Sequence, residues 1–126
     1  MKVRLLQCKP SDPARVSFLS AHGTGQANWS GPRPALDAWL EVELDLDDAF
    51  HWGENLKPST HHDCQLRVQD DALHLRAELI AIEADGTGAL NVGGSIVLIS
   101  LAPNPEARTG WVELVARDVT LQGVAL

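Results

Sequence analysis

The sequence has few basic residues, only two cysteines and no long hydrophobic run. Ten lysines and arginines stand against 17 aspartates and glutamates, which gives a net charge of −7. Because nucleic-acid binding needs a basic face, this balance argues against a nucleic-acid partner. No apolar run approaches the ~20 residues that cross a bilayer, so no membrane partner is predicted. Cys8 and Cys64 are too few for a disulfide-dense secreted scaffold.

The cysteines and the start of the chain indicate a cytoplasmic protein. Two reduced thiols are the simpler interpretation of Cys8 and Cys64, and a bond between them is the alternative. Residues 1–8 lack the apolar stretch of a secretory signal. No phosphate-binding glycine loop and no nucleophile-elbow pattern occurs in the sequence, so neither a cofactor nor an enzymatic activity is predicted.

What the chain does contain is a strand pattern. Its 126 residues, 44% of them hydrophobic, predict a single domain over residues 1–126 with a core of its own. Apolar and polar residues alternate through most of the chain, which is the period of a half-buried strand. Residues 15–20 fit either a strand or a short helix, and their neighbours favour the strand. Residues 23–34, rich in Gly and Pro, predict a loop.

The clearest predicted strand covers residues 36–47. Its even-numbered residues are apolar and predicted to face inward. Its outward residues are predicted to be Asp37, Trp39, Glu41, Glu43, Asp45 and Asp47. Further along the chain, Asp70-Asp71 and Asp85-Gly86 predict hairpin turns. The apolar parity changes at Leu79-Ile80, which indicates a β-bulge or a strand buried on both faces.

Six or seven strands and at most one short helix follow from these patterns. They favour an all-β fold, an antiparallel barrel or a sandwich. The long strand from about residue 73 to 83 and the Gly93-Gly94 break suit a small barrel, in which strands coil sharply.

Several segments also resemble a known group of proteins. They are Asn-Trp-Ser-Gly-Pro at 28–32, Trp-Leu-Glu-Val-Glu-Leu-Asp at 39–45, His-Trp-Gly-Glu-Asn at 51–55, Gly-Gly-Ser-Ile-Val-Leu at 93–98 and Gly-Trp-Val-Glu-Leu at 110–114. The order is similar to that in small bacterial proteins of immunity or partner-binding type. The resemblance implies a partly open, OB-like β-barrel, and it implies no catalytic residues.

The acidic stripe of residues 37–47 is the strongest candidate site. Successive outward residues of a strand lie roughly 7 Å apart, inside the Debye length of about 8 Å, so their carboxylates repel one another. Outward Arg67, His74 and Arg76 are candidates to offset this charge from within the molecule. A basic protein partner, such as a toxin bound by its immunity protein, would offset it from outside. The simpler alternative is a solvated edge strand kept charged against aggregation.

Tryptophans and histidines suggest a second function. Trp29, His51 and Trp52, predicted in loops, are candidates to bind a small molecule or sugar at the barrel mouth. His51, His61, His62 and Cys64 carry zinc-binding atoms, but their spacing matches no zinc motif, and surface histidines are the simpler interpretation. A third hypothesis is self-association. The apolar residues that suggest it are Val119, Leu121, Val124 and Leu126.

Overall fold

The structure, a computed structural model, describes residues 1–124, and all regular structure in this range is β-strand. Twelve strands are present, which confirms the all-β class but exceeds the six or seven predicted. Residues 15–20 form a strand, as favoured. The strands are β1 (Lys2–Lys9), β2 (Arg15–Ser20), β3 (Gly23–Ser30), β4 (Trp39–Leu46), β5 (Ala49–Phe50), β6 (Leu56–Pro58), β7 (Gln65–Gln69), β8 (Ala72–Ile82), β9 (Thr87–Val92), β10 (Ser95–Leu101), β11 (Gly110–Ala116) and β12 (Val119–Gly123).

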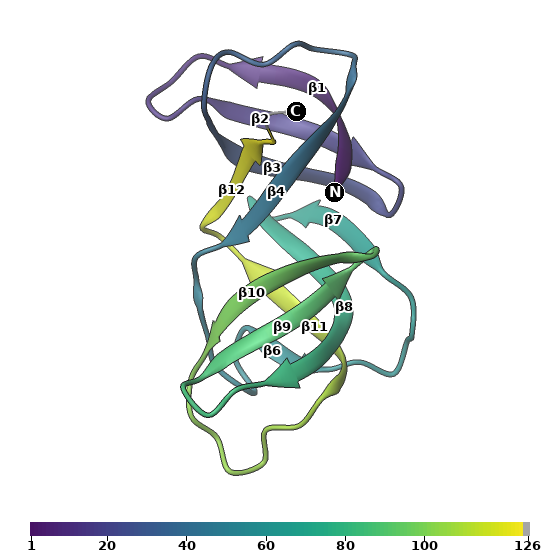
Figure 1. The fold of residues 1–126 in the computed structure, drawn as a ribbon, viewed down its shortest axis with the longest axis vertical. Coiled ribbons are helices and arrows are strands. Elements are labelled where there is room, and N and C mark those ends of the chain that lie inside the picture. The colour runs from purple at the N-terminus through teal and green to yellow at the C-terminus, as the bar shows by residue number, and fades with distance from the viewer. Residues whose placement is uncertain (125–126) are drawn as a thin grey trace.

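Five strands form a closed barrel, in the upper half of Figure 1. β1 pairs with β2, β2 with β3, β3 with β12, β12 with β4, and β4 with β1, so the ring has no free end. The sequence predicts a partly open, antiparallel barrel, whereas this ring is closed and its β3–β12 pairing is parallel. The closing strand is the last one in the chain, and no local pattern reveals a pairing at such sequence separation.

The remaining strands form a second sheet below the barrel in Figure 1. Its order is β6-β11-β8-β9-β10-β5, and β7 lies beside the first half of β8. β7 also touches the barrel through one parallel pair, Gly23 with Leu66. Buried apolar residues of the barrel and of the second sheet belong to one continuous cluster. The two halves therefore share a core.

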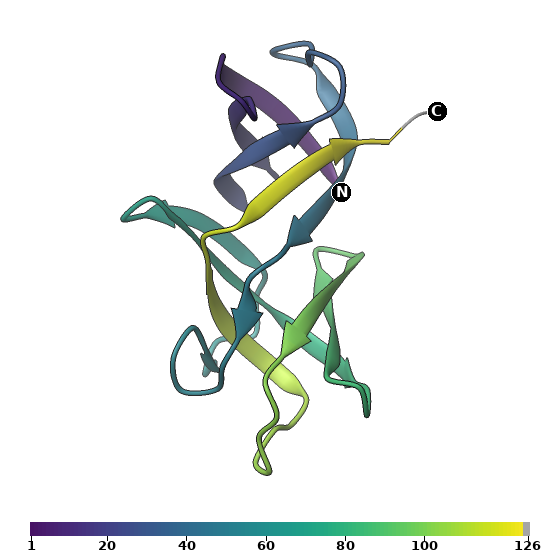
Figure 2. The ribbon, with the colours of Figure 1, turned by 90° about the vertical axis from the view of Figure 1, so that its left-hand side faces the viewer.

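The chain crosses between the two halves along adjacent paths. One crossing follows β4, and the other runs from β11 into β12, drawn in yellow in Figure 2. The N–H of Asp47 donates to the carbonyl of Asp118 at 2.9 Å. The carboxylate of Asp48 accepts the backbone N–H groups of Arg117 and Asp118 at 3.0 and 2.8 Å. One side chain thus ties the two crossing segments together.

Alternation along the strands decides which side chains enter the core. Val42, Leu44 and Leu46 of β4 are buried, as predicted. In β8 the parity changes at a bulge between Leu79 and Ala81, which confirms the bulge rather than a doubly buried strand. Both predicted hairpin turns are present, between β7 and β8 and between β8 and β9.

Residues 23–30 form a strand, although the sequence predicts a loop there. Gly25 lies directly under the aromatic ring of Phe18, so the absent side chain makes room for a core residue. Gly23, with φ of 132°, approaches the backbone of Leu66 where the barrel meets β7. These glycines allow a neighbouring ring or backbone to come close to the strand, and they do not form a turn. Composition alone does not distinguish the two roles.

Residues 36–38, predicted as the first part of the acidic strand, lie before β4. Asp37 adopts a left-handed φ of 63°, and its N–H donates to the carbonyl of Leu5 at 2.9 Å. This turn leaves Leu36 47% exposed, although it was expected to face inward. The predicted alternation therefore begins only at Trp39.

We expect Gly25→Ala to destabilise the protein by about 1–3 kcal/mol, because the new methyl group overlaps the Phe18 ring in a packed core. Equilibrium denaturation in urea measures the loss. Gly123→Ala is the matched control, since its Cβ would lie 3.5 Å from the Trp29 ring, at ordinary contact distance. Equal stability of the two variants would show that the ring moves aside at little cost.

Candidate partner-binding site

The acidic residues of β4 point outward from the barrel. Glu43 and Asp45 are exposed, and Leu44 between them is buried. Asp47 is exposed just after the strand, and Glu41 is half-buried. Trp39, at the start of the strand, is 55% exposed. From Trp39 to Asp47, the predicted outward face therefore exists as one continuous stripe.

Two of the predicted site residues have a positive neighbour within the molecule. The carboxylate of Asp37, which is largely exposed, lies 3.7 Å from the guanidinium of the half-buried Arg4 on β1. The carboxylate of Glu41 lies 3.3 Å from the amino group of Met1. These contacts offset charge only at the end of the stripe nearest Trp39.

The other end of the stripe carries negative charge alone. Within residues 1–124, no ion pair involves Glu43, Asp45 or Asp47. The pKa of Asp47 is raised, first by partial burial and then by the carboxylates of Asp118, Asp45 and Asp48. The protein thus holds these carboxylates near one another without a cation to relieve their repulsion.

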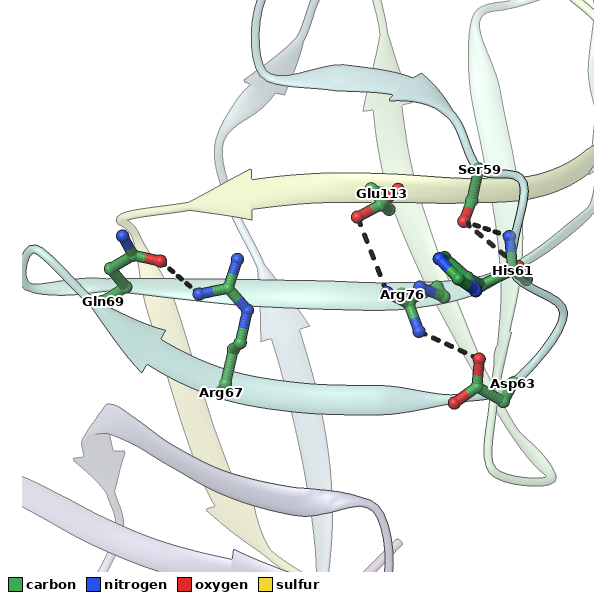
Figure 3. A network of polar contacts seen from close by, with 7 residues as sticks. All are labelled: Ser59, His61, Asp63, Arg67, Gln69, Arg76 and Glu113. Atoms are coloured by element: carbon green, nitrogen blue, oxygen red, sulfur yellow. Dashed lines mark hydrogen bonds and ion pairs between the residues drawn. The ribbon is translucent and has the colours of Figure 1, made fainter.

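The arginines expected to offset the stripe lie on the second sheet instead. Arg76 of β8 contacts Asp63 at 2.9 Å and Glu113 of β11 at 3.8 Å (Figure 3). Arg67 of β7 donates to Gln69 on the same strand. Both guanidinium groups contact residues of the second half of the molecule, and within residues 1–124 neither forms an ion pair with the stripe.

A groove of about 320 Å³ lies between the acidic end of β4 and the strand β10. Its walls are residues 42–45 of β4 and 95–98 of β10, with Met1 at one side. Ile96 and Leu98 are 57% and 63% exposed, the most exposed large hydrophobic side chains of the described chain. Carboxylates and aliphatic side chains therefore face the same hollow.

Sequence reasoning misses this groove, although part of its signal is present. Residues 96–99 are all aliphatic, so a strand that contains them has apolar side chains on both faces. Val97 and Ile99 enter the core. Because a strand alternates, their neighbours Ile96 and Leu98 must then point outward. Only the tertiary structure shows that Ile96 and Leu98 face the acidic stripe.

The residues of the alternative ligand site are not brought together. Trp29, predicted in a loop, belongs to β3 and is 8% exposed, and its Nε1 donates to the carbonyl of Pro32 at 2.8 Å. It forms part of the barrel core. Trp52 is half-buried in the second half of the molecule, and His51 is exposed beside Glu54, at 3.8 Å. Trp52 lines a hollow with Pro58, Asn104 and Arg108 that neither Trp29 nor His51 lines.

The side chains of His51, His61, His62 and Cys64, weighed above as a zinc site, do not form a metal-binding cluster in the described residues. No group of three or more His, Cys, Asp or Glu side chains that could hold a metal ion occurs within residues 1–124. The ring of His62 stacks on Trp111, with centroids 5.9 Å apart. Both cysteines are free thiols, and burial raises the pKa of Cys64.

Two of the four apolar residues that suggest self-association are buried in the barrel. Val119 and Leu121 are 2% and 0% exposed, because β12 places them inside the closed barrel. Val124 is 41% exposed. Leu126 lies outside the described residues. The buried pair is therefore unavailable to a second copy in the folded barrel.

Comparison of the chain with protein-family models, with curated proteins and with solved structures finds no match. The resemblance to immunity-type proteins therefore stays a prediction. In the described part of the chain, no helix is long and apolar enough to cross a membrane.

We expect Asp47→Asn to raise the free energy of unfolding at neutral pH. The pKa of Asp47 is raised in the folded protein, so its ionised form costs stability above that pKa. As pH falls through the folded pKa and then through the ordinary aspartate value of 3.8, the cost disappears. Thermal unfolding of both proteins between about pH 7 and pH 3 should show a gain that vanishes at the acidic end.

Glu106→Gln is the control for Asp47→Asn, because it removes one exposed carboxylate from a loop of the second sheet. It reports the general effect of lowering the net negative charge. If both substitutions stabilise equally at every pH, the local repulsion around Asp47 is not the cause.

Proposed function

We propose that this chain is a non-enzymatic interaction module that binds a basic protein partner. The contact surface is the outward face of β4, with Trp39 at one end and Glu43, Asp45 and Asp47 at the other. The observation that carries the proposal is that Glu43, Asp45 and Asp47 have no ion pair within residues 1–124. Two of them, Glu43 and Asp45, line the groove with the highly exposed Ile96 and Leu98.

Electrostatics and apolar contact have separate roles in this proposal. A net charge of −7 attracts a cationic partner over a distance and speeds its association. Trp39, which is 55% exposed, provides the kind of large aromatic side chain that anchors many interfaces. Charge thus guides the partner, and aromatic and aliphatic contacts retain it.

The finer predictions belong to the same proposal. Three further predictions rest on the resemblance and the composition described above. They are an OB-like topology, a bacterial source and a cytoplasmic location. A toxin that is neutralised by its immunity protein is the kind of pairing that fits a small acidic binder. In that pairing the toxin would present a basic surface to β4.

We expect the double substitution Glu43→Gln with Asp45→Asn to weaken binding of a labelled oligolysine roughly fivefold, since two exposed carboxylates together contribute about 1 kcal/mol. Fluorescence anisotropy of an oligolysine about ten residues long measures the affinity. Raising the salt from roughly 20 to 300 mM should weaken binding to the unaltered protein, because the attraction is screened.

The matched control is Glu83→Gln with Glu106→Gln. It makes the same change in net charge at two exposed positions that do not line the groove. Equal loss of affinity in both double variants would mean that oligolysine responds to total charge, and the β4 face would lose its assigned role. Binding that does not depend on salt would contradict the electrostatic part of the proposal.

A further inference from the structure

β4 and β10 form the two walls of the groove, but no backbone pairing joins these two strands. β5, which follows β4 along the chain, pairs with β10 at Ser100 and Leu101 alone. Within residues 1–124, the rest of β10 has a strand partner only in β9, and residues 43–46 of β4 have one only in β12. The groove lies between the two edges that have no strand partner.

Peptide groups of β4 face this groove. The N–H of Val42 donates to the carbonyl of Met1 at 2.8 Å, on the side of β4 opposite to β12. Hydrogen-bonding direction alternates along a strand, so the N–H and C=O groups of Leu44 and Leu46 point to the same side. β1 pairs with β4 only at Trp39–Glu41 and does not reach them.

Peptide groups of β10 face the groove from the other wall. The N–H of Ala102 donates to the carbonyl of Phe50 at 2.8 Å, on the edge opposite to β9. The same alternation directs the N–H and C=O groups of Ile96 and Leu98 to this edge. An unpaired edge of this kind is a template for a further strand.

The side chains specify which strand would fit. On the outer face, an inserted strand would have Glu43 and Asp45 on one side and Ile96 and Leu98 on the other. Lysine and arginine match both, because their aliphatic stems cover apolar surface while their charged ends reach carboxylates. The alternate side chains of the inserted strand would point toward the core between the halves, where apolar residues are favoured.

The chain already shows this pattern on the same edge of β4. In β1, Lys2 and Arg4 alternate with Val3 and Leu5. Val3 and Leu5 are 0% exposed, and Arg4 reaches Asp37 at 3.7 Å. A cationic strand with apolar residues between its charges therefore already pairs with the first part of β4.

We propose that the groove takes up an extended segment of the basic partner, in which Lys or Arg alternates with apolar residues, as a strand between β4 and β10. This inference rests on the proposed function and adds the way in which the partner is held. Backbone hydrogen bonds supply affinity, and the acidic and aliphatic walls supply the sequence preference. A second copy of this chain is a poorer occupant, because two molecules of charge −7 repel each other.

The test uses three capped peptides of about eight residues, a common strand length. The first alternates Lys and Val. The second has the same sequence with every second backbone nitrogen methylated, which removes hydrogen-bond donors but keeps the charge. The third has the same composition with all lysines before all valines. We expect the alternating peptide to bind at least about tenfold more tightly than either control. The methylated peptide loses at least two backbone hydrogen bonds, and the third peptide would direct lysines toward the core and valines toward the carboxylates.

Amide exchange on the labelled protein locates the bound peptide. The N–H groups of Ile96, Leu98, Leu44 and Leu46 should exchange slowly only in the presence of the alternating peptide. Leu98→Ser should weaken binding of that peptide several-fold by removing an aliphatic wall. Ile80→Ser, at a 45% exposed position on β8, is the control and should leave the affinity unchanged.

The outcomes separate this inference from the proposed function. If all three peptides bind equally and Glu43→Gln with Asp45→Asn weakens each of them, the acidic face binds cations and strand insertion is wrong. If none of the three peptides binds but oligolysine does, strand insertion alone is wrong. If oligolysine also fails to bind, both proposals are wrong. A dimer of the free protein that Leu98→Ser dissociates would assign the groove to a second copy and overturn the insertion of a partner strand.

Discussion

Parallel pairing between β3 and β12 closes the barrel, and the exposed features of β4 depend on that closure. A closed ring has an inside and an outside, so Leu44 and Leu46 are buried while Glu43 and Asp45 stay in water. β12 also covers one edge of β4 and leaves the other edge facing β10. The charged stripe and the unpaired edge thus have a common structural cause.

Local patterns in the sequence predict the strands and their inward faces well. The alternation of residues 39–47, the bulge after Leu79 and the turn at Asp70-Asp71 are all present. Each depends on a period of two or on turn chemistry within a few residues. The same information identifies the acidic stripe, because the residues of a strand that face outward are known once those that face the core are known.

Long-range geometry is what the sequence does not reveal. Gly25 looks like a turn residue until the Phe18 ring is seen above it. Trp29 looks like a loop residue until β12 completes the barrel around it. Arg76 looks available to the acidic stripe until Asp63 and Glu113 are found beside it. In each case, the deciding neighbour is remote in the chain or on another strand.

The contact of Asp48 with Arg117 and Asp118 has a consequence for the distant groove. β4 belongs to the barrel and β10 to the second sheet, so the separation of the two walls is set by the angle between the halves. The carboxylate of Asp48 hydrogen-bonds the two crossing segments to each other where the chain passes between the halves. Removing these hydrogen bonds would change the distance between β4 and β10 and so the shape of the groove, although every residue that lines the groove would be unchanged.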